Sequence, residues 1–115
     1  MINYKCFLID QDKTSYIYRV ELTNSNTGEI FVIPRYHMGI ALQRDPELLD
    51  ILASILTDTQ AAACESFDEF AAEYGYDPDS RKAEKIYLAC CQESQEFKTV
   101  FPDIDLSSMP ELENY

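Results

Sequence analysis

The sequence predicts an α+β fold in which a three-stranded antiparallel sheet packs against about three helices, in a single domain over residues 1–115. Residues 1–44 are mainly β, because they contain short runs of strand-forming residues separated by turn formers. Residues 45–101 are helical, since their apolar side chains recur every three or four positions. The length and the hydrophobic fraction of 46% are those of one globular domain with a core. We expect residues 102–115 to form a frayed or loosely docked acidic tail.

We expect strands at Tyr4–Asp10, Tyr16–Leu22 and Glu29–Pro34. The second run alternates apolar and polar side chains, which is the period of a strand with one buried face. The turn formers of Thr23–Gly28 keep the connection short, and short connections favour an antiparallel meander. We expect Pro34 to end the third strand, and residues 35–44 fit neither a helix nor a strand clearly.

Two helices have recognisable ends. Asp45 is a good N-cap for the first, and Pro46 suits its first helical position. The second begins at a capping box formed by Ser66 and Glu69, and Gly75 stands where a left-handed C-terminal residue is expected. The apolar stripe of the first helix consists of Leu48, Leu49, Leu52, Ile55 and Leu56.

A third helix is expected to start near Asp77–Pro78 or at Asp79 and to end at Pro102. Its stripe consists of Ala83, Ile86, Tyr87, Cys90, Ser94, Phe97 and Phe101. The core face of the last two helices should pack on the sheet or on the helix at 48–56; its residues are Phe67, Phe70, Tyr74, Ile86, Tyr87, Cys90 and Phe97.

The net charge of −12 is unevenly distributed along the chain. Residues 1–44 carry a net charge of +1, and residues 45–115 carry −13. Seven carboxylates and no cation lie between Asp58 and Asp79. Phosphate contacts need Lys and Arg, so we expect no direct binding of nucleic acid. A basic protein surface remains a suitable partner.

The sequence indicates no catalytic residue, no metal site and no cofactor, so we do not expect an enzyme. It contains no CxxC pair or glycine-rich phosphate loop, and His37 is its only histidine. Asp77 and Asp79 resemble the start of an EF-hand loop, but Lys82 replaces the required glycine and Leu88 the closing glutamate. The four cysteines are expected to be reduced packing residues. No apolar run approaches the ~20 residues that span a bilayer, and no signal peptide is recognisable, so the expected location is cytoplasmic.

The cation-free interval supplies the candidate partner-binding surface. Its residues are Glu65, Asp68, Glu69, Glu73, Tyr76, Asp77 and Asp79. One interpretation is a solvated helix face that keeps the protein soluble. The other is that the carboxylates mimic the phosphates of a nucleic acid, since neighbouring side chains on a helix lie ~5–6 Å apart. Tyr76 is either a rim residue of the fold or an anchor for a partner.

The stretch SFDEFAAEYGYDPDSRKAEKIYLAC resembles a set of small phage and prophage proteins of mostly uncharacterised function. The residues that match the shared pattern are Ser66, Phe67, Phe70, Glu73, Tyr74, Gly75, Tyr76, Asp77, Asp79, Ser80, Arg81, Lys82, Ala83, Lys85, Tyr87 and Cys90. It covers about a quarter of the chain, and the β region departs from it in detail. The resemblance implies a mobile-element origin.

By class analogy, that origin predicts a non-catalytic, anti-CRISPR-like inhibitor of host defence. Its partner would be a basic nucleic-acid-binding host protein or complex, its location the host bacterial cytosol, and its state a monomer or homodimer. The alternative function is a small structural or regulatory adaptor that binds protein without nucleic-acid mimicry.

Overall fold

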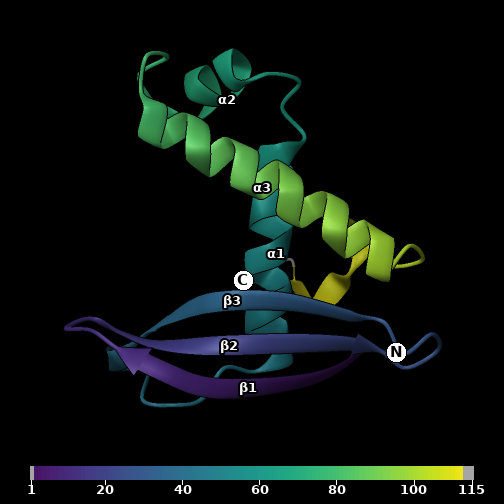
Figure 1. Ribbon diagram of the computed structural model, residues 1–115. Helices are drawn as coiled ribbons and strands as arrows, with labels where there is room; N and C mark the ends of the chain where they lie inside the picture. Colours follow the sequence, from purple (N-terminus) through teal and green to yellow (C-terminus); the bar gives the residue numbers. More distant parts are fainter. Residues whose placement is uncertain (1, 113–115) are drawn as a thin grey trace. The chain divides into compact units, whose positions relative to one another are not determined.

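Three strands come before three helices along the chain in the computed structural model, which describes residues 2–112 (Figure 1). The strands are β1 (Ile2–Gln11), β2 (Ser15–Asn24) and β3 (Ile30–Gly39), and the helices are α1 (Leu48–Ala62), α2 (Phe67–Tyr74) and α3 (Arg81–Val100). Short 3₁₀ turns lie at Ile40–Leu42, Leu106–Ser108 and Pro110–Leu112. The predicted α+β class, with a three-stranded antiparallel sheet and three helices, is confirmed.

The chain divides into two compact units, Met1–Asp50 and Ile51–Tyr115. The packing of the helices on the sheet and the organisation as a single domain stay predictions. No helix within residues 2–112 is long and apolar enough to cross a membrane.

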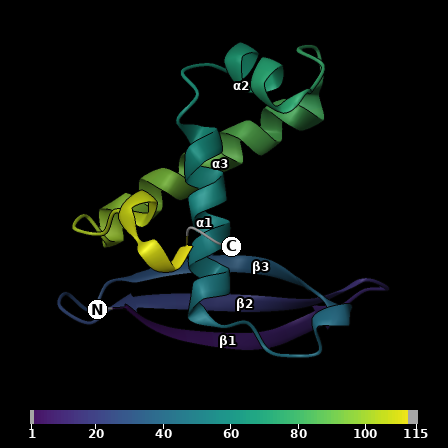
Figure 2. The same cartoon turned by 180° about the vertical axis from the view of Figure 1, so that it is seen from behind.

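The sheet is the predicted meander, with the strand order β1-β2-β3 (Figure 2). Residues directly opposite each other across two strands share a face of the sheet. One face carries the buried side chains of β2 and β3; these are Tyr18, Val20, Leu22, Phe31 and Met38. The alternation read in the sequence therefore places Tyr18, Val20 and Leu22 of β2 on one buried face, as predicted. Ile17 lies on the other face and is also buried, at 3% exposure, which the alternation does not predict.

The sequence predicts that the third strand ends at Pro34. This prediction is wrong, because the strand continues to Gly39. Tyr18 pairs with Tyr36 and Val20 pairs with Ile33, so β3 has one more residue than β2 between these two pairs. This irregularity is a β-bulge at the edge of the sheet, where a proline without an N–H group is tolerated.

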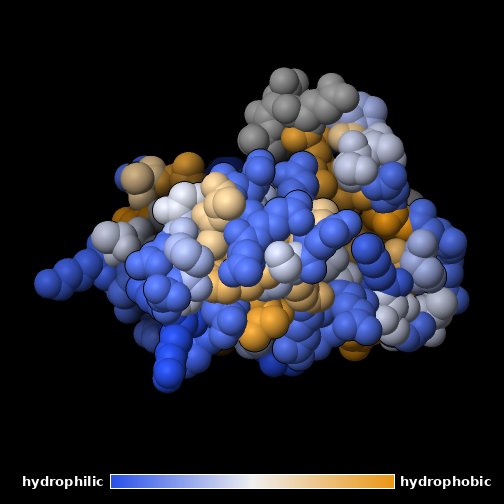
Figure 3. All heavy atoms as spheres, turned by 90° about the horizontal axis from the view of Figure 1, so that it is seen from above, coloured by the Kyte–Doolittle hydropathy of each residue, from blue (hydrophilic) through white to orange (hydrophobic). Residues whose placement is uncertain are grey.

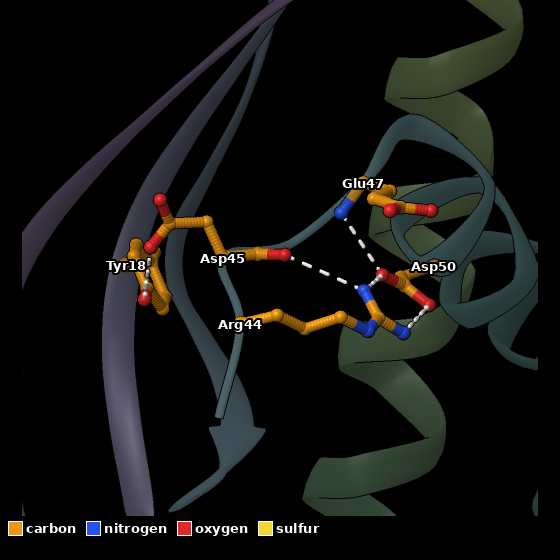
Figure 4. Close-up of polar contacts among 5 residues, drawn as sticks. All are labelled: Tyr18, Arg44, Asp45, Glu47 and Asp50. Atoms are coloured by element: carbon orange, nitrogen blue, oxygen red, sulfur yellow. Dashed lines mark hydrogen bonds and ion pairs between the residues drawn. The ribbon is translucent and has the colours of Figure 1, made fainter. Parts of the chain in front are cut away.

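Helix α1 begins at Leu48, so Asp45 is not its N-cap and Pro46 is not its first residue, contrary to the prediction. The Asp45 carboxylate instead accepts a hydrogen bond from the Tyr18 hydroxyl at 3.1 Å (Figure 4). The Asp50 carboxylate accepts the backbone N–H of Glu47 at 2.9 Å. A carboxylate in the first turn that bonds the N–H just before the helix is half of a capping box.

The second unit buries one stripe from each helix. The buried residues are Ile51, Leu52, Ile55, Ala61, Phe70, Ala71, Ala83, Tyr87, Cys90, Ser94, Phe97 and Val100. Three predicted core residues of the last two helices are not fully buried: Phe67 is partly buried, Ile86 is 39% exposed and Tyr74 is 45% exposed. Ile86 precedes the buried Tyr87, and that one-residue step turns its side chain about 100° around the helix, away from the core.

The segment after α3 is not frayed over residues 102–112. Leu106 and Leu112 are each 5% exposed. Asp105 accepts the N–H of Ser107 at 3.1 Å and so begins a 3₁₀ turn. The prediction of a loose tail is wrong for this segment, because its two leucines are buried. Residues 113–115 of the predicted tail lie outside the described residues.

Candidate acidic protein-binding surface

Helix α2 is fixed at its N-terminus by the residues that the sequence indicated. The Ser66 hydroxyl accepts the N–H of Glu69 at 3.2 Å, which satisfies one of the free donors of the first turn. The Glu69 carboxylate accepts the N–H of Glu65 at 3.1 Å, one residue further back than a capping box predicts. Glu69 therefore has a structural role at this end of the surface.

The C-terminus of α2 is a Schellman motif. Gly75 has a φ of 76°, in the left-handed region that favours glycine. The N–H of Tyr76 donates to the carbonyl of Ala71 at 2.8 Å. The ring of Tyr76 stacks on that of Phe70, with centroids 5.4 Å apart. The position of Tyr76 is thus explained by the fold, and 42% of its surface remains exposed.

Phe70 is the centre of an aromatic cluster that joins α2 to α3. It is 2% exposed, and the ring of Tyr87 on α3 lies 5.2 Å from its own. The rings of Tyr74 and Phe67 contact it at 4.9 and 6.3 Å. The Tyr87 hydroxyl also donates to the carbonyl of Cys64 at 2.6 Å. The cluster and this hydrogen bond hold α2 beside the N-terminal half of α3, as Figure 1 shows.

The turn between α2 and α3 is also held by short-range hydrogen bonds. Asp77 accepts the N–H of Asp79 at 2.9 Å. The Ser80 hydroxyl accepts the N–H of Ala83 at 3.1 Å, so α3 begins at Arg81, slightly later than predicted. The Asp77 carboxylate therefore stabilises the turn. Asp79 takes part in this hydrogen bond only through its backbone N–H group.

All seven predicted site residues are exposed, and all lie on α2 or on the turns at its two ends. They are Glu65, Asp68, Glu69, Glu73, Tyr76, Asp77 and Asp79. Within residues 2–112, the ion pairs join Arg19 with Glu21, Arg35 with Asp10, and Arg44 with Asp50, so none involves this surface. Hydrophilic side chains also predominate on the face of the molecule drawn in Figure 3. We call the seven residues the α2 acidic surface.

Asp58, the seventh carboxylate of the cation-free interval, does not belong to the α2 acidic surface. Asp58 lies on α1 and hydrogen bonds with Glu93 and with the thiol of Cys90, both on α3. Burial, followed by this hydrogen bond and the charge of Asp58, raises the pKa of Glu93 to about 9. The pairing of Asp58 with Glu93 is not predicted from the sequence. Its only signal there is that Glu93 falls three residues after Cys90 and four before Phe97, within the buried stripe.

The cysteines near α2 are poor nucleophiles. Burial raises the pKa of the Cys64 thiol, and the charges of Glu69 and Glu73 add to this effect. Burial, with the charges of Asp58 and Glu93, raises the pKa of Cys90 to about 12. Both thiols are therefore protonated at neutral pH, and the thiolate is the reactive form.

Metal and small-molecule sites have little support in the described part of the chain. It contains no group of three or more His, Cys, Asp or Glu residues that could hold a metal ion. A hollow of about 480 Å³ lies between α1 and the segment that follows α3. Its lining includes Leu56, Gln60, Leu106, Met109 and Leu112 and contains no titratable side chain.

Comparisons with protein-family models, with curated proteins and with solved structures give no match to this chain.

Proposed function

We propose that this protein is a non-catalytic, phage- or prophage-type inhibitor of host defence that acts as an acidic nucleic-acid mimic. The α2 acidic surface would occupy the nucleic-acid-recognition surface of a basic host protein or complex, as an anti-CRISPR-like protein does, in the host bacterial cytosol. The observation that carries the proposal is that six carboxylates at positions 65–79 are exposed and none is in an ion pair within residues 2–112.

Charge density supports this function. Neighbouring carboxylates on one helix face lie roughly 5–6 Å apart, whereas duplex DNA carries one charge per ~1.7 Å of axis, so the mimicry is coarse. Coarse mimicry is sufficient for attraction, because a basic channel draws in a surface of opposite charge and raises the association rate. Folding also fixes the spacing in advance, since both ends of α2 are capped.

Asp68, Glu73 and Asp79 are the carboxylates to test. Glu69 and Asp77 accept backbone hydrogen bonds, and replacing them would disturb the helix ends. The carboxylates of the other three accept no hydrogen bond within the described chain. The variant Asp68→Lys with Glu73→Lys and Asp79→Lys therefore changes charge and keeps the caps.

A matched control reverses three exposed carboxylates elsewhere, at Glu29, Asp103 and Glu111. Both triple variants change the net charge equally, and circular dichroism verifies that each is folded. Tagged proteins are used to capture partners from a bacterial host lysate. Mimicry predicts that wild type and control retain a nucleic-acid-binding complex that DNA or salt displaces, and that the α2 variant loses it. Binding that survives in the α2 variant would refute the proposal.

A protein-binding adaptor is the second candidate. It is favoured by the exposed apolar side chains of β1, where Phe7 is 46% and Leu8 58% exposed. Binding through such a surface should change little with salt, whereas exposed charges are screened within ~8–10 Å at physiological ionic strength. Capture of a partner that resists salt, and that the α2 variant still binds, would favour the adaptor.

A further inference from the structure

The outer edge of β1 is open. The described sheet has the order β1-β2-β3, so β1 has a strand on one side only. Its other edge presents backbone N–H and C=O groups, which can pair with a further strand. Tyr4, Phe7, Leu8 and Ile9 all lie on β1, and each is between 42% and 58% exposed. A long, apolar, unpaired edge of this kind is a template for strand addition.

The opposite edge of the sheet is protected. Strand β3 carries Pro34, which has no N–H group to donate, and the adjacent bulge interrupts its ladder. By contrast, β1 is regular from Ile2 to Leu8, where each residue pairs with one residue of β2, and its irregularity comes only at Ile9. Strand β1 is therefore the more regular of the two edges for the addition of a strand.

We propose that two copies of this protein form a homodimer by antiparallel pairing of their β1 strands, so that one sheet runs through both copies. The two-fold axis must lie within the regular stretch Ile2–Leu8, because the ladder is broken at Ile9. An axis at Lys5 would place two ammonium groups opposite each other, which is unfavourable.

An axis at Cys6 makes the strand complementary to itself. Tyr4 then lies opposite Leu8 of the second copy on one face, and Lys5 lies opposite Phe7 of the second copy on the other. Both pairs match in character: the first is apolar, and the second sets a cation beside the negative face of an aromatic ring. The exposed side chains of residues 4–8 are thus all paired, which is why a second copy is the occupant that fits this edge.

The charge distribution also favours this contact. Met1–Asp50 carries seven acidic and five basic side chains, whereas Ile51–Tyr115 carries fourteen acidic and four basic ones. Two identical chains with a net charge of −12 repel each other, and the repulsion is smallest where their nearly neutral units meet. The α2 acidic surface lies in the other unit, so this inference does not depend on the proposed function.

The native Cys6 reports the register directly. Directly opposite residues in an antiparallel pair have Cα atoms roughly 4.5–5.5 Å apart, within the range that a disulfide bridges. Mild oxidation with diamide, which accepts the two electrons and two protons of the thiols, should give a covalent dimer on a non-reducing gel. Cys6→Ser should remove that dimer, and the control Cys91→Ser should keep it.

Sedimentation equilibrium of the reduced protein tests the contact without a cross-link. Phe7→Lys places two cations opposite each other and should raise the dissociation constant of the dimer by at least about tenfold. Phe7→Glu gives Lys5 a carboxylate across the interface and should keep the dissociation constant within about tenfold of wild type. A merely apolar contact would be weakened equally by both changes.

Each result decides the proposal. A reduced dimer that Phe7→Lys dissociates, with cross-linking at Cys6, supports it. A monomer at high micromolar concentration overturns it. So does a dimer that does not cross-link through Cys6 or that binds equally well after Phe7→Lys, because its interface would then lie elsewhere. Circular dichroism of both Phe7 variants distinguishes loss of the dimer from loss of the fold.

Discussion

The carboxyl pair between α1 and α3 makes stability depend on pH in an unusual direction. The Glu93 carboxyl has an ordinary pKa of 4.5, which we take for the unfolded chain, and burial beside Asp58 raises its pKa to about 9 in the folded chain. Between these values the folded chain binds more protons than the unfolded one. The free energy of unfolding therefore falls as pH rises through this window. The contribution is fully present below the unfolded pKa and is lost above the folded one.

The size of the effect follows from the linkage. One proton per chain gives a slope of at most about 1.4 kcal/mol per pH unit. Glu93 is only partly buried, so solvent screening reduces the effect, and the loss from about pH 5 to about pH 7 is about 1–2 kcal/mol. Replacement of Glu93 by Gln removes the titration and keeps a donor toward Asp58. Glu93→Gln should therefore match wild type near pH 5 and exceed its stability by about 1–2 kcal/mol near pH 7.

Urea unfolding followed by far-UV circular dichroism measures this, at several pH values for each variant. Other titrating groups affect both proteins equally, so the difference between wild type and Glu93→Gln isolates the pair. Glu84→Gln is the control, since Glu84 is an exposed carboxylate in the first turn of the same helix. It should keep the wild-type slope. Equal pH dependence of wild type and Glu93→Gln would refute the raised pKa of Glu93 as the cause of the effect.

Three substitutions test the packing of α2 by the same urea assay. Phe70→Ala removes the centre of the aromatic cluster and should cost about 3–5 kcal/mol; a loss below about 1 kcal/mol would contradict its central place. Gly75→Ala places a side chain at a φ of 76° and should cost about 1–2 kcal/mol, whereas Gly39→Ala, at a φ of −59°, should cost much less. Tyr87→Phe removes the hydrogen bond to the Cys64 carbonyl and should cost about 0.5–1.5 kcal/mol, and an unchanged midpoint would show that this bond contributes no stability.

The features that the sequence predicts well are local ones. Ser66 and Ser80 accept backbone N–H groups at helix starts, and Gly75 ends a helix in the left-handed conformation. Each of these residues acts within a few positions of itself, so its chemistry can be recognised without knowledge of the tertiary fold. The period-2 pattern of β2 belongs to the same class.

The errors occurred where tertiary contacts decide. Aspartate is a residue type that often caps helices, but the carboxylate of Asp45 accepts a hydrogen bond from the hydroxyl of Tyr18, 27 positions away in sequence. A proline would interrupt a central strand, but it is tolerated in an edge strand with a bulge, as Pro34 is in β3. Whether a strand lies at the edge or in the centre depends on the arrangement of the whole sheet. The acidic character of the last segment suggested fraying, whereas the burial of Leu106 and Leu112 determines its structure.

The candidate site divides in the same way. The α2 acidic surface was predicted correctly as exposed, because the polar face of an amphipathic helix follows from its period. Asp58 could not be separated from that surface by sequence, since its partner Glu93 is 35 residues away and on another helix. Binding of a partner by this surface depends on the second molecule as well, so it does not follow from the sequence pattern of one chain.

The proline of β3 has a consequence for assembly. A sheet with two open edges can add copies at both sides and grow without limit, as fibres do. In the described sheet, Pro34 and the bulge weaken the β3 edge, so pairing of the proposed dimer at β1 would leave no equally regular edge for further copies. Growth would then stop after a single addition, and the symmetry would be a closed two-fold. In the proposed dimer, Pro34 would thus limit the stoichiometry of association, although it lies on the strand that takes no part in the pairing.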